Sequence, residues 1–185
     1  LLASHDAHNA ALTFALKQNL PTGRHDRLAR HNLAEATGSG AATTRIALYG
    51  QAYFLPEQNL RGRINVSWRV PGSHASLDGD SAYGTPAGFE GRVELGGASE
   101  ASLGLEYSLN PRWVLATDLV YEQDRGARLR GTIPSDAGAV AFDRDLPSSW
   151  RASVAPAVEY HWNDRIGLIA GAFVCFGGRY SRPVV

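Results

Sequence analysis

The sequence predicts an all-β protein whose antiparallel strands follow one another in chain order. One reason is a strict alternation of apolar and polar residues, clearest in residues 60–70, where Ile64 and Trp68 fall on one face and Arg61 and Arg63 on the other. Successive side chains of a strand point to opposite faces, so this period of two indicates a strand with one apolar and one charged face. A second reason is the regular spacing of turn signals, and a third is that no segment combines helical periodicity with helix caps.

Seven strands are expected, and the connections between them alternate between long loops and short turns. Pro21 and Gly23 end the first strand, because proline lacks a ladder N–H and glycine permits a turn. The expected strands are residues 8–20, 43–54, 60–70, 89–109, 113–121, 150–162 and 166–176. The short turns are residues 55–59, 110–112 and 163–165, and the long loops are residues 24–40, 71–88 and 122–149.

The large apolar residues of each strand keep one parity. They are even-numbered in the first three strands, odd-numbered in residues 89–109 and 113–121, and even-numbered again in residues 150–162. Each of these strands therefore has one apolar face, and the surroundings of that face are either a protein core or lipid.

The composition limits the possible classes of function. A chain of 185 residues is long enough for a single domain with a sizeable core, and its net charge of zero argues against nucleic-acid binding. No stretch approaches the roughly 18 continuous apolar residues of a membrane helix, but barrel strands are shorter and only half apolar. The one cysteine, Cys175, allows no internal disulfide and is expected to be a small buried hydrophobe. No signal peptide is visible at Leu1, so the chain is interpreted as a mature segment or a fragment.

Aromatic residues on the apolar parity gather at both ends of the expected strands. Together with the alternating loop lengths, two aromatic rows separated by aliphatic residues are typical of an outer-membrane β-barrel. The alternative is a soluble sandwich or a lipocalin-like barrel. The row beside the short turns holds Phe54, Tyr107, Trp113, Tyr160 and Trp162, and the row beside the long loops holds Trp68, Phe89, Tyr121 and Trp150.

The opposite face is too charged for a protein core, because unpaired burial of ionised groups is costly, whereas a wet lumen tolerates them. Arginines of residues 60–70 are expected to pair with glutamates of residues 89–109 across one loop. This lining either selects ions and solutes or forms a self-neutralising lattice that stiffens the wall. The expected lumen-lining residues are Arg45, Arg61, Arg63, Arg69, Glu94, Glu100, Glu106, Asp118 and Glu159.

Several short motifs resemble those of a known family. They are Lys-Gln-Asn-Leu-Pro-Thr-Gly at residues 17–23, Gly-Ser-Gly at 38–40, the hairpin at 105–113, and the runs at 155–160 and 165–171. The resemblance, which covers most of the chain, is to the MetA-pathway-of-phenol-degradation family of Gram-negative outer-membrane β-barrels. The resemblance implies a bacterial outer-membrane location, contact with membrane lipid, and transport of apolar or aromatic compounds, with no catalytic residues.

Two departures from the family pattern accompany the resemblance. Thr43 and Thr44 stand where the family often has an acidic residue, and residues 175–185 lack a final strand that closes on an aromatic residue. An odd number of strands also conflicts with the even number of bacterial single-chain barrels. The expectation is therefore an incomplete barrel, with further strands on both sides of this chain.

Other chemistry is weighed against this interpretation. Ser153 and His161 share a face but lie too far apart for a hydrolase pair, and Gly38–Gly40 lacks the lysine and helix of a phosphate loop. The histidines His5, His8, His25 and His31 have no carboxylates or cysteines that complete a metal site. The apolar loop residues 137–142 either fold inward as a constriction or pack on a neighbouring loop.

The sequence thus predicts no enzyme activity, no cofactor and no metal. The expected function is passive passage of small, hydrophobic or aromatic solutes through an outer-membrane barrel. Two alternatives stay open: a structural or adhesive barrel with a plugged lumen, and a soluble lipocalin-like ligand-binding barrel.

Overall fold

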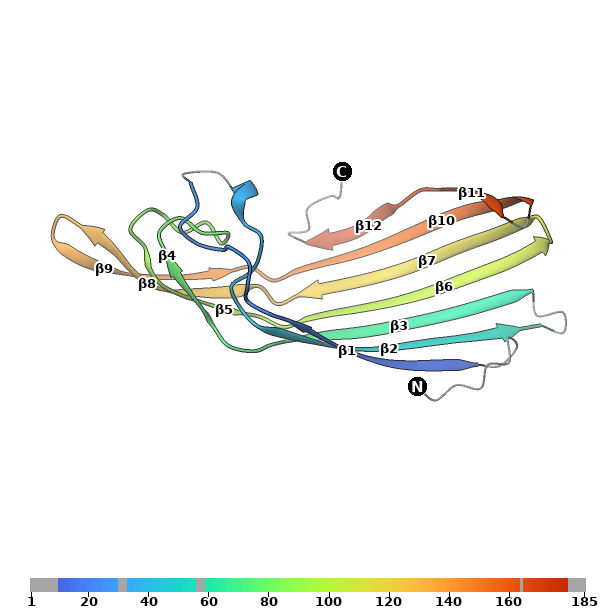
Figure 1. The fold of residues 1–185 in the computed structure, drawn as a ribbon, viewed down its shortest axis with the longest axis horizontal. Coiled ribbons are helices and arrows are strands. Elements are labelled where there is room, and N and C mark those ends of the chain that lie inside the picture. The colour runs from blue at the N-terminus through green and yellow to red at the C-terminus, as the bar shows by residue number, and fades with distance from the viewer. Residues whose placement is uncertain (1–9, 30–32, 56–58, 164, 180–185) are drawn as a thin grey trace.

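The computed structural model describes residues 10–29, 33–55, 59–163 and 165–179, and within them the chain is all-β and antiparallel (Figure 1). The large sheet contains β1 (Ala11–Asn19), β2 (Thr43–Phe54), β3 (Leu60–Pro71), β6 (Ala98–Asn110), β7 (Trp113–Asp124), β10 (Ser149–Asn163), β11 (Ile166–Gly171) and β12 (Val174–Arg179). The second sheet contains β4 (Ala75–Asp78), β5 (Glu90–Leu95), β8 (Ala127–Ser135) and β9 (Gly138–Leu146). A 3₁₀ helix, η1, spans Leu33–Glu35, and the described residues hold no helix long and apolar enough to cross a membrane.

Neighbouring strands of the large sheet lie in the order β1-β2-β3-β6-β7-β10-β11, with β12 also paired to β10. The register of β12 continues that of β11, since Ala157 lies opposite Gly171 and Val154 opposite Val174. Pro156 of β10 lies between these pairs and has no N–H to donate, which explains why the last expected strand is split in two. The large sheet therefore has seven strand positions, as the alternation predicts.

The large sheet is open in the part of the chain that the structure describes. β1 and β11 form its two edges, and no pairing joins them. This agrees with the expectation that these residues alone do not close a barrel. The expectation that further strands complete it stays a prediction.

Two of the predicted long loops contain β-strands. Residues 71–88 contain β4, residues 122–149 contain β8 and β9, and the expected strand 89–109 is divided into β5 and β6. The division is a bend: the Gly96 N–H donates to the Gly126 carbonyl at 2.7 Å, and the Arg125 N–H donates to the Gly97 carbonyl at 2.9 Å. Gly126 has a φ of 74°, a conformation that favours glycine. The paired ribbon thus bends out of the large sheet and continues as the second sheet (Figure 1).

The main hydrophobic core lies under the second sheet. Its largest buried side chain is Phe89, which is 0% exposed and meets Phe142 edge-on at 5.3 Å between ring centroids. A Cβ at Gly91 or Gly131 would lie 2.6 or 2.7 Å from the Phe89 ring, so these glycines make room for the ring. The buried cluster consists of Ala41, Ala75, Leu77, Phe89, Val93 and Leu129.

The predicted place of Phe89 in an aromatic row is wrong, because its ring is covered by this core. Among the apolar loop residues 137–142, Phe142 packs against the same core, which favours packing on a neighbouring segment over an inward constriction.

The polar loop that follows β1 packs along β4. The Arg27 N–H donates to the Asp78 carbonyl at 3.0 Å, and the Ala82 N–H donates to the His25 carbonyl at 2.9 Å. We call the second sheet, together with residues 23–29, 33–41 and 79–89, the loop lobe. It forms one end of the molecule, and the short turns lie at the other end (Figure 1).

Candidate functional site

The large sheet has one face that is apolar from edge to edge and uncovered. Cross-strand register aligns aliphatic side chains into rows: one row runs through Leu12, Gly50, Ile64, Leu103, Leu119 and Val154. Ile64 is 55% exposed, Leu103 46% and Leu119 47%. A contiguous apolar surface of this extent marks a site of interaction with a partner protein or a membrane.

Eight of the nine predicted aromatic residues lie on this apolar face. At the loop-lobe end, Tyr121 stacks on Trp150 with 6.2 Å between ring centroids, and Trp68 shares a register row with Trp150. At the turn end, Trp113 and Tyr160 are 4.6 Å apart. Phe54, Tyr107 and Trp162 complete the turn-end row and are 51%, 38% and 67% exposed.

The spacing of the two aromatic rows can be compared with the dimensions of a membrane barrel. The loop-lobe row crosses β3 at Trp68 and the turn-end row crosses it at Leu60, opposite Phe54 and Tyr107. Eight residues of strand span about 26 Å, or about 20 Å of height at a barrel tilt of about 40°. That height is close to the apolar band of about 25 Å on outer-membrane barrels.

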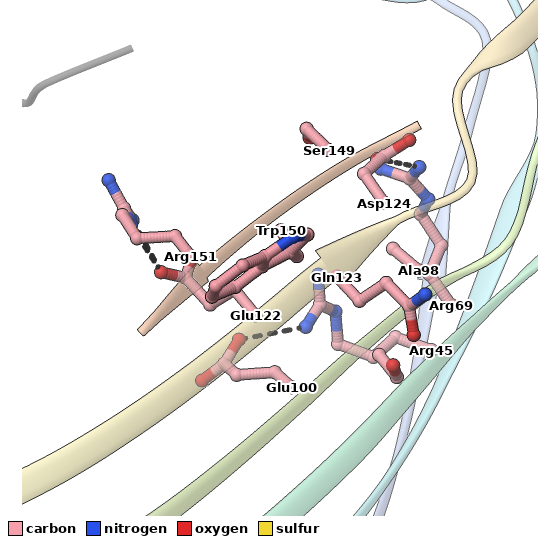
Figure 2. A pocket seen from close by; sticks show the side chains of 11 residues that line it. Arg45, Arg69, Ala98, Glu100, Glu122, Gln123, Asp124, Ser149, Trp150 and Arg151 are labelled. Carbon is pink, nitrogen blue, oxygen red and sulfur yellow. Dashed lines mark hydrogen bonds and ion pairs between the residues drawn. The ribbon is translucent and has the colours of Figure 1, made fainter. Parts of the chain in front are cut away.

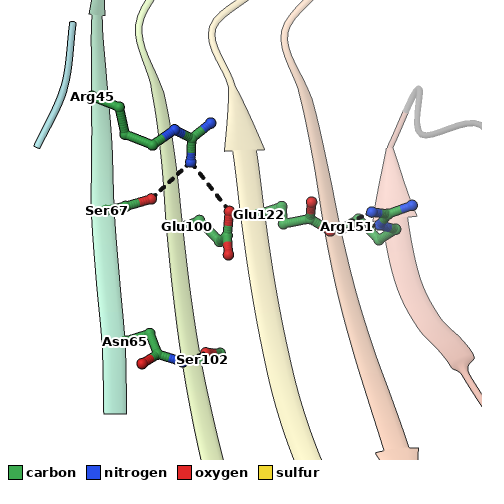
Figure 3. Close-up of polar contacts among 7 residues, drawn as sticks. All are labelled: Arg45, Asn65, Ser67, Glu100, Ser102, Glu122 and Arg151. Atoms are coloured by element: carbon green, nitrogen blue, oxygen red, sulfur yellow. Dashed lines mark hydrogen bonds and ion pairs between the residues drawn. The ribbon is translucent and has the colours of Figure 1, made fainter. Parts of the chain in front are cut away.

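The opposite face carries ion pairs that reach across an intervening strand. Arg45 of β2 contacts Glu100 of β6 at 3.3 Å and donates to Ser67 of β3, between them, at 2.8 Å (Figure 3). Arg63 of β3 contacts Asp118 of β7 at 3.4 Å. These pairs are possible because the residue in between is small.

Gly104 shows this most clearly. It lies on β6 between Arg63 and Asp118, and a Cβ there would come within 3.2 Å of the Arg63 Nε. In the same way Ala98 lies between Arg69 and Asp124, whose side chains are 2.6 Å apart. Small residues of β6 thus let arginines of β3 reach carboxylates of β7.

Neighbouring strands supply further ion pairs. Glu106 contacts Arg61 at 2.5 Å and Arg63 at 2.9 Å. Arg151 of β10 donates to Glu122 of β7 at 2.8 Å (Figure 2). Within β10, His161 lies 3.6 Å from Glu159, which is an ion pair only when the histidine is protonated. Each of the arginines predicted to line the lumen therefore has a carboxylate partner. They are Arg45, Arg61, Arg63 and Arg69. We call this set of ion pairs the polar network.

One predicted lining residue lies elsewhere. Glu94 belongs to β5 of the second sheet and contacts Arg92 at 3.1 Å and Arg130 at 3.8 Å. The prediction that it pairs with the arginines of β3 is wrong, because the bend at Gly96 and Gly97 takes β5 away from β3.

Sequence reasoning missed three members of the polar network. Glu122 and Asp124 fall in a stretch interpreted as loop, and Arg151 is not among the expected lining residues. The signal that could have found the two acids is parity, since Glu122 and Asp124 continue the even-numbered charged face that begins at Asp118.

Burial distinguishes the two faces of the large sheet. Small residues between the charged side chains are buried: Ala47 is 2% exposed, Ser67 7% and Ser153 0%. The large side chains of the apolar face are mostly exposed. The side chains of the polar network therefore cover the small residues between them, whereas the apolar face is uncovered.

A hollow of about 310 Å³ lies where the polar network meets the loop lobe (Figure 2). Three ion pairs border it: Arg45 with Glu100, Arg69 with Asp124, and Arg151 with Glu122. The remaining residues that line it are Ala98, Ser99, Gln123, Ser149 and Trp150. Charges of both signs line the hollow in equal number.

The chemical sites weighed from the sequence are not assembled in the described residues. The Ser153 hydroxyl is buried without a hydrogen-bond partner, and so makes no pair with His161. The His25 ring nitrogens face the carbonyls of Gly23 and Ser76, and no group of three metal-binding side chains occurs in the described ranges. His5, His8 and His31 lie outside the described residues.

Cys175 is exposed, so the prediction of a buried cysteine is wrong. It lies on β12, which pairs only with β10 in the described sheet, and this edge position leaves the side chain uncovered.

Three groups of the loop lobe have perturbed ionisation. The hydrogen bonds from Arg128, at 2.9 and 3.2 Å, lower the pKa of Asp143, and the same pair raises the pKa of Arg128. Burial raises the pKa of Tyr83, whose hydroxyl donates to the Ser39 carbonyl at 2.6 Å. These groups form no reactive cluster.

Removing Glu106 is expected to weaken the polar network. Glu106→Gln leaves Arg61 and Arg63 facing each other without their shared carboxylate, whose side chain is only 21% exposed. The expected cost is about 1–3 kcal/mol in the free energy of unfolding. Glu100→Gln is the matched control: it breaks one pair that is 45% exposed, with an expected cost under about 1 kcal/mol. Urea titration followed by tryptophan fluorescence measures both, and equal losses would contradict a central role for Glu106.

Comparison of the chain with models of known protein families finds no match, and no curated protein matches it. The resemblance described from the sequence motifs therefore stays a prediction.

Proposed function

We propose that the chain forms part of the wall of a bacterial outer-membrane β-barrel that lets small, hydrophobic or aromatic solutes cross passively. The observation that carries this proposal is the large sheet, which exposes a continuous apolar face and pairs its charges on the other face. Strands β2, β3, β6 and β7 have 12, 12, 13 and 12 residues, enough for the roughly 9–11 residues of a membrane strand. The resemblance to the MetA-pathway-of-phenol-degradation family belongs to the same proposal.

In this arrangement the apolar face contacts lipid and the polar network lines the lumen. Because its arginines are paired with carboxylates, the lining has little net charge, and we expect weak discrimination between cations and anions. The ion pairs favour the self-neutralising lattice over an ion-selecting lining. Solutes would diffuse along this wall, and the loop lobe would border the outer mouth.

The test is reconstitution of the full-length protein into lipid vesicles. We expect the vesicles to become permeable to small uncharged solutes in a swelling assay, with single-channel currents that select poorly between potassium and chloride. Absence of both swelling and current would contradict the channel and favour a structural barrel with a plugged lumen. A protein that stays monomeric in solution without detergent, and shows no heat-modifiable migration on a gel, would contradict the barrel and favour a soluble ligand-binding protein.

A further inference from the structure

The second sheet has a buried face and an exposed polar face, and two arginines stand opposite each other on the polar face. Arg92 of β5 and Arg130 of β8 are direct cross-strand partners, and their side chains are 47% and 43% exposed. Like charges at directly opposed positions repel each other. An opposed arginine pair is therefore destabilising by itself and calls for a compensating anion.

The nearby carboxylates are distributed unevenly. Asp143 lies opposite Arg130 in the register, yet it contacts Arg128 at 2.9 Å, and Asp145 contacts Arg128 at 3.5 Å. Arg92 and Arg130 share a single carboxylate, that of Glu94. Among the described residues, Arg128 thus contacts two carboxylates and the opposed pair contacts one, while the Asp143 carboxylate also attracts Arg130 electrostatically from its position opposite that residue.

The opposed pair borders a hollow of about 440 Å³. Gly91 and Gly131 lie opposite each other beside the arginines and border the hollow with their backbone, while the Phe89 ring fills their side-chain positions on the other face. His74 and Ser76 complete the lining, and both are exposed. The hollow therefore presents two guanidinium forks, a hydroxyl and an imidazole, all of which can donate hydrogen bonds.

We propose that this hollow, the Arg92–Arg130 site, binds a phosphate monoester group or free phosphate. The planar guanidinium fork matches the oxygen spacing of a tetrahedral oxyanion and can donate two parallel hydrogen bonds to it. Ser76 lies opposite Arg92 and is placed to add a third donor group. Glu94 competes with the anion for the same guanidiniums. The site lies in the loop lobe and is independent of the channel proposal.

Calorimetric titration of the full-length protein in neutral detergent tests the site. The probes are inorganic phosphate and a short-chain phosphatidic acid, with phosphatidylcholine of the same chain length as the control lipid. Arg92→Gln and Arg130→Gln are each expected to weaken binding at least about tenfold, since each removes a charge-assisted donor pair. Arg144→Gln removes the same charge from β9 outside the hollow, and its effect is expected to stay within about twofold. Glu94→Gln is expected to tighten binding.

The outcomes separate the possibilities. Saturable binding of phosphate alone identifies a soluble ligand, and binding of phosphatidic acid alone identifies a lipid headgroup; either supports the site. The absence of saturable binding of both probes to the unaltered protein would overturn it. Equal weakening of phosphate binding by Arg92→Gln and Arg144→Gln would also overturn the site, because that result indicates general charge attraction. Weaker phosphate binding by the Glu94→Gln variant would overturn it as well.

Discussion

Replacing Leu119 by arginine is expected to impair assembly into a bilayer by about 2–4 kcal/mol, the cost of a cation on the lipid face at the midplane. Leu119 is 47% exposed on the apolar face of β7. It lies four residues from Leu115, which shares the row of Tyr107, and four from Gln123, which shares the row of Trp68 and Trp150. It is therefore midway between the two aromatic rows. Ile64 and Leu103 occupy the same row on their strands, so arginine at either position is expected to have a similar effect.

Val120→Arg is the matched control. Val120 is the next residue on β7, at almost the same depth, and its side chain points to the face of the polar network between Ser102 and Ser153. An arginine on this face does not meet lipid, so the midplane cost is absent and the expected loss is smaller than that of Leu119→Arg. Urea titration of the protein folded into vesicles, with heat-modifiable migration on a gel, measures both variants. Equal losses would refute the assignment of lipid to one face and lumen to the other.

Arg63→Glu is not a suitable control for Leu119→Arg, although the strand alternation places Arg63 on the face of the polar network. Arg63 contacts both Glu106 and Asp118, so a glutamate there would place three carboxylates together. We expect this variant to destabilise the wall through like-charge repulsion, in addition to any change in selectivity. Only the register of β3, β6 and β7 reveals this.

Replacing Phe89 by alanine is expected to destabilise the loop lobe by about 3–5 kcal/mol, the usual cost of truncating a buried aromatic ring. The ring is 0% exposed, meets Phe142 edge-on, and covers the backbone at Gly91 and Gly131. Its loss would leave a cavity in the main hydrophobic core of the lobe. Because the large sheet has its own pairing, the effect is expected to be confined to β4, β5, β8 and β9.

Hydrogen exchange read by mass spectrometry tests this prediction. Protection is expected to fall in β5 and β8 of the Phe89→Ala variant and to stay unchanged in β2 and β3. Val140→Ala, at a β9 position that is 48% exposed, serves as the control and is expected to change the free energy by less than about 0.5 kcal/mol. Loss of protection spread equally over both sheets would show that the two sheets unfold as one unit.

The fold class and the strands of the large sheet could be predicted from the sequence because their signal is local. The pleat of a strand imposes a period of two on neighbouring residues, so residues 43–54 and 60–70 correspond closely to β2 and β3. The charged and apolar faces follow from the same parity. Even the pairing of Arg61 with Glu106 could be anticipated, since it joins strands that are consecutive in the large sheet.

The loop lobe could not be predicted in this way. Phe89, Gly91 and Val93 keep the odd parity of Leu103 and Leu105, so the alternation passes through the bend at Gly96 and Gly97 without a visible break. The same pattern therefore occurs in two environments. On β6 the odd-numbered residues form part of the uncovered face, whereas on β5 they are covered by the core of the loop lobe.

The sequence by itself determined which side chains share a face, because that depends only on the backbone geometry of adjacent residues. The tertiary structure decided what each face meets and which charges pair. Arg63 reaches Asp118 only because Gly104 lies between them, a coincidence of three strands in register. Register and bending depend on contacts between residues far apart in the chain, and a local pattern carries no information about them.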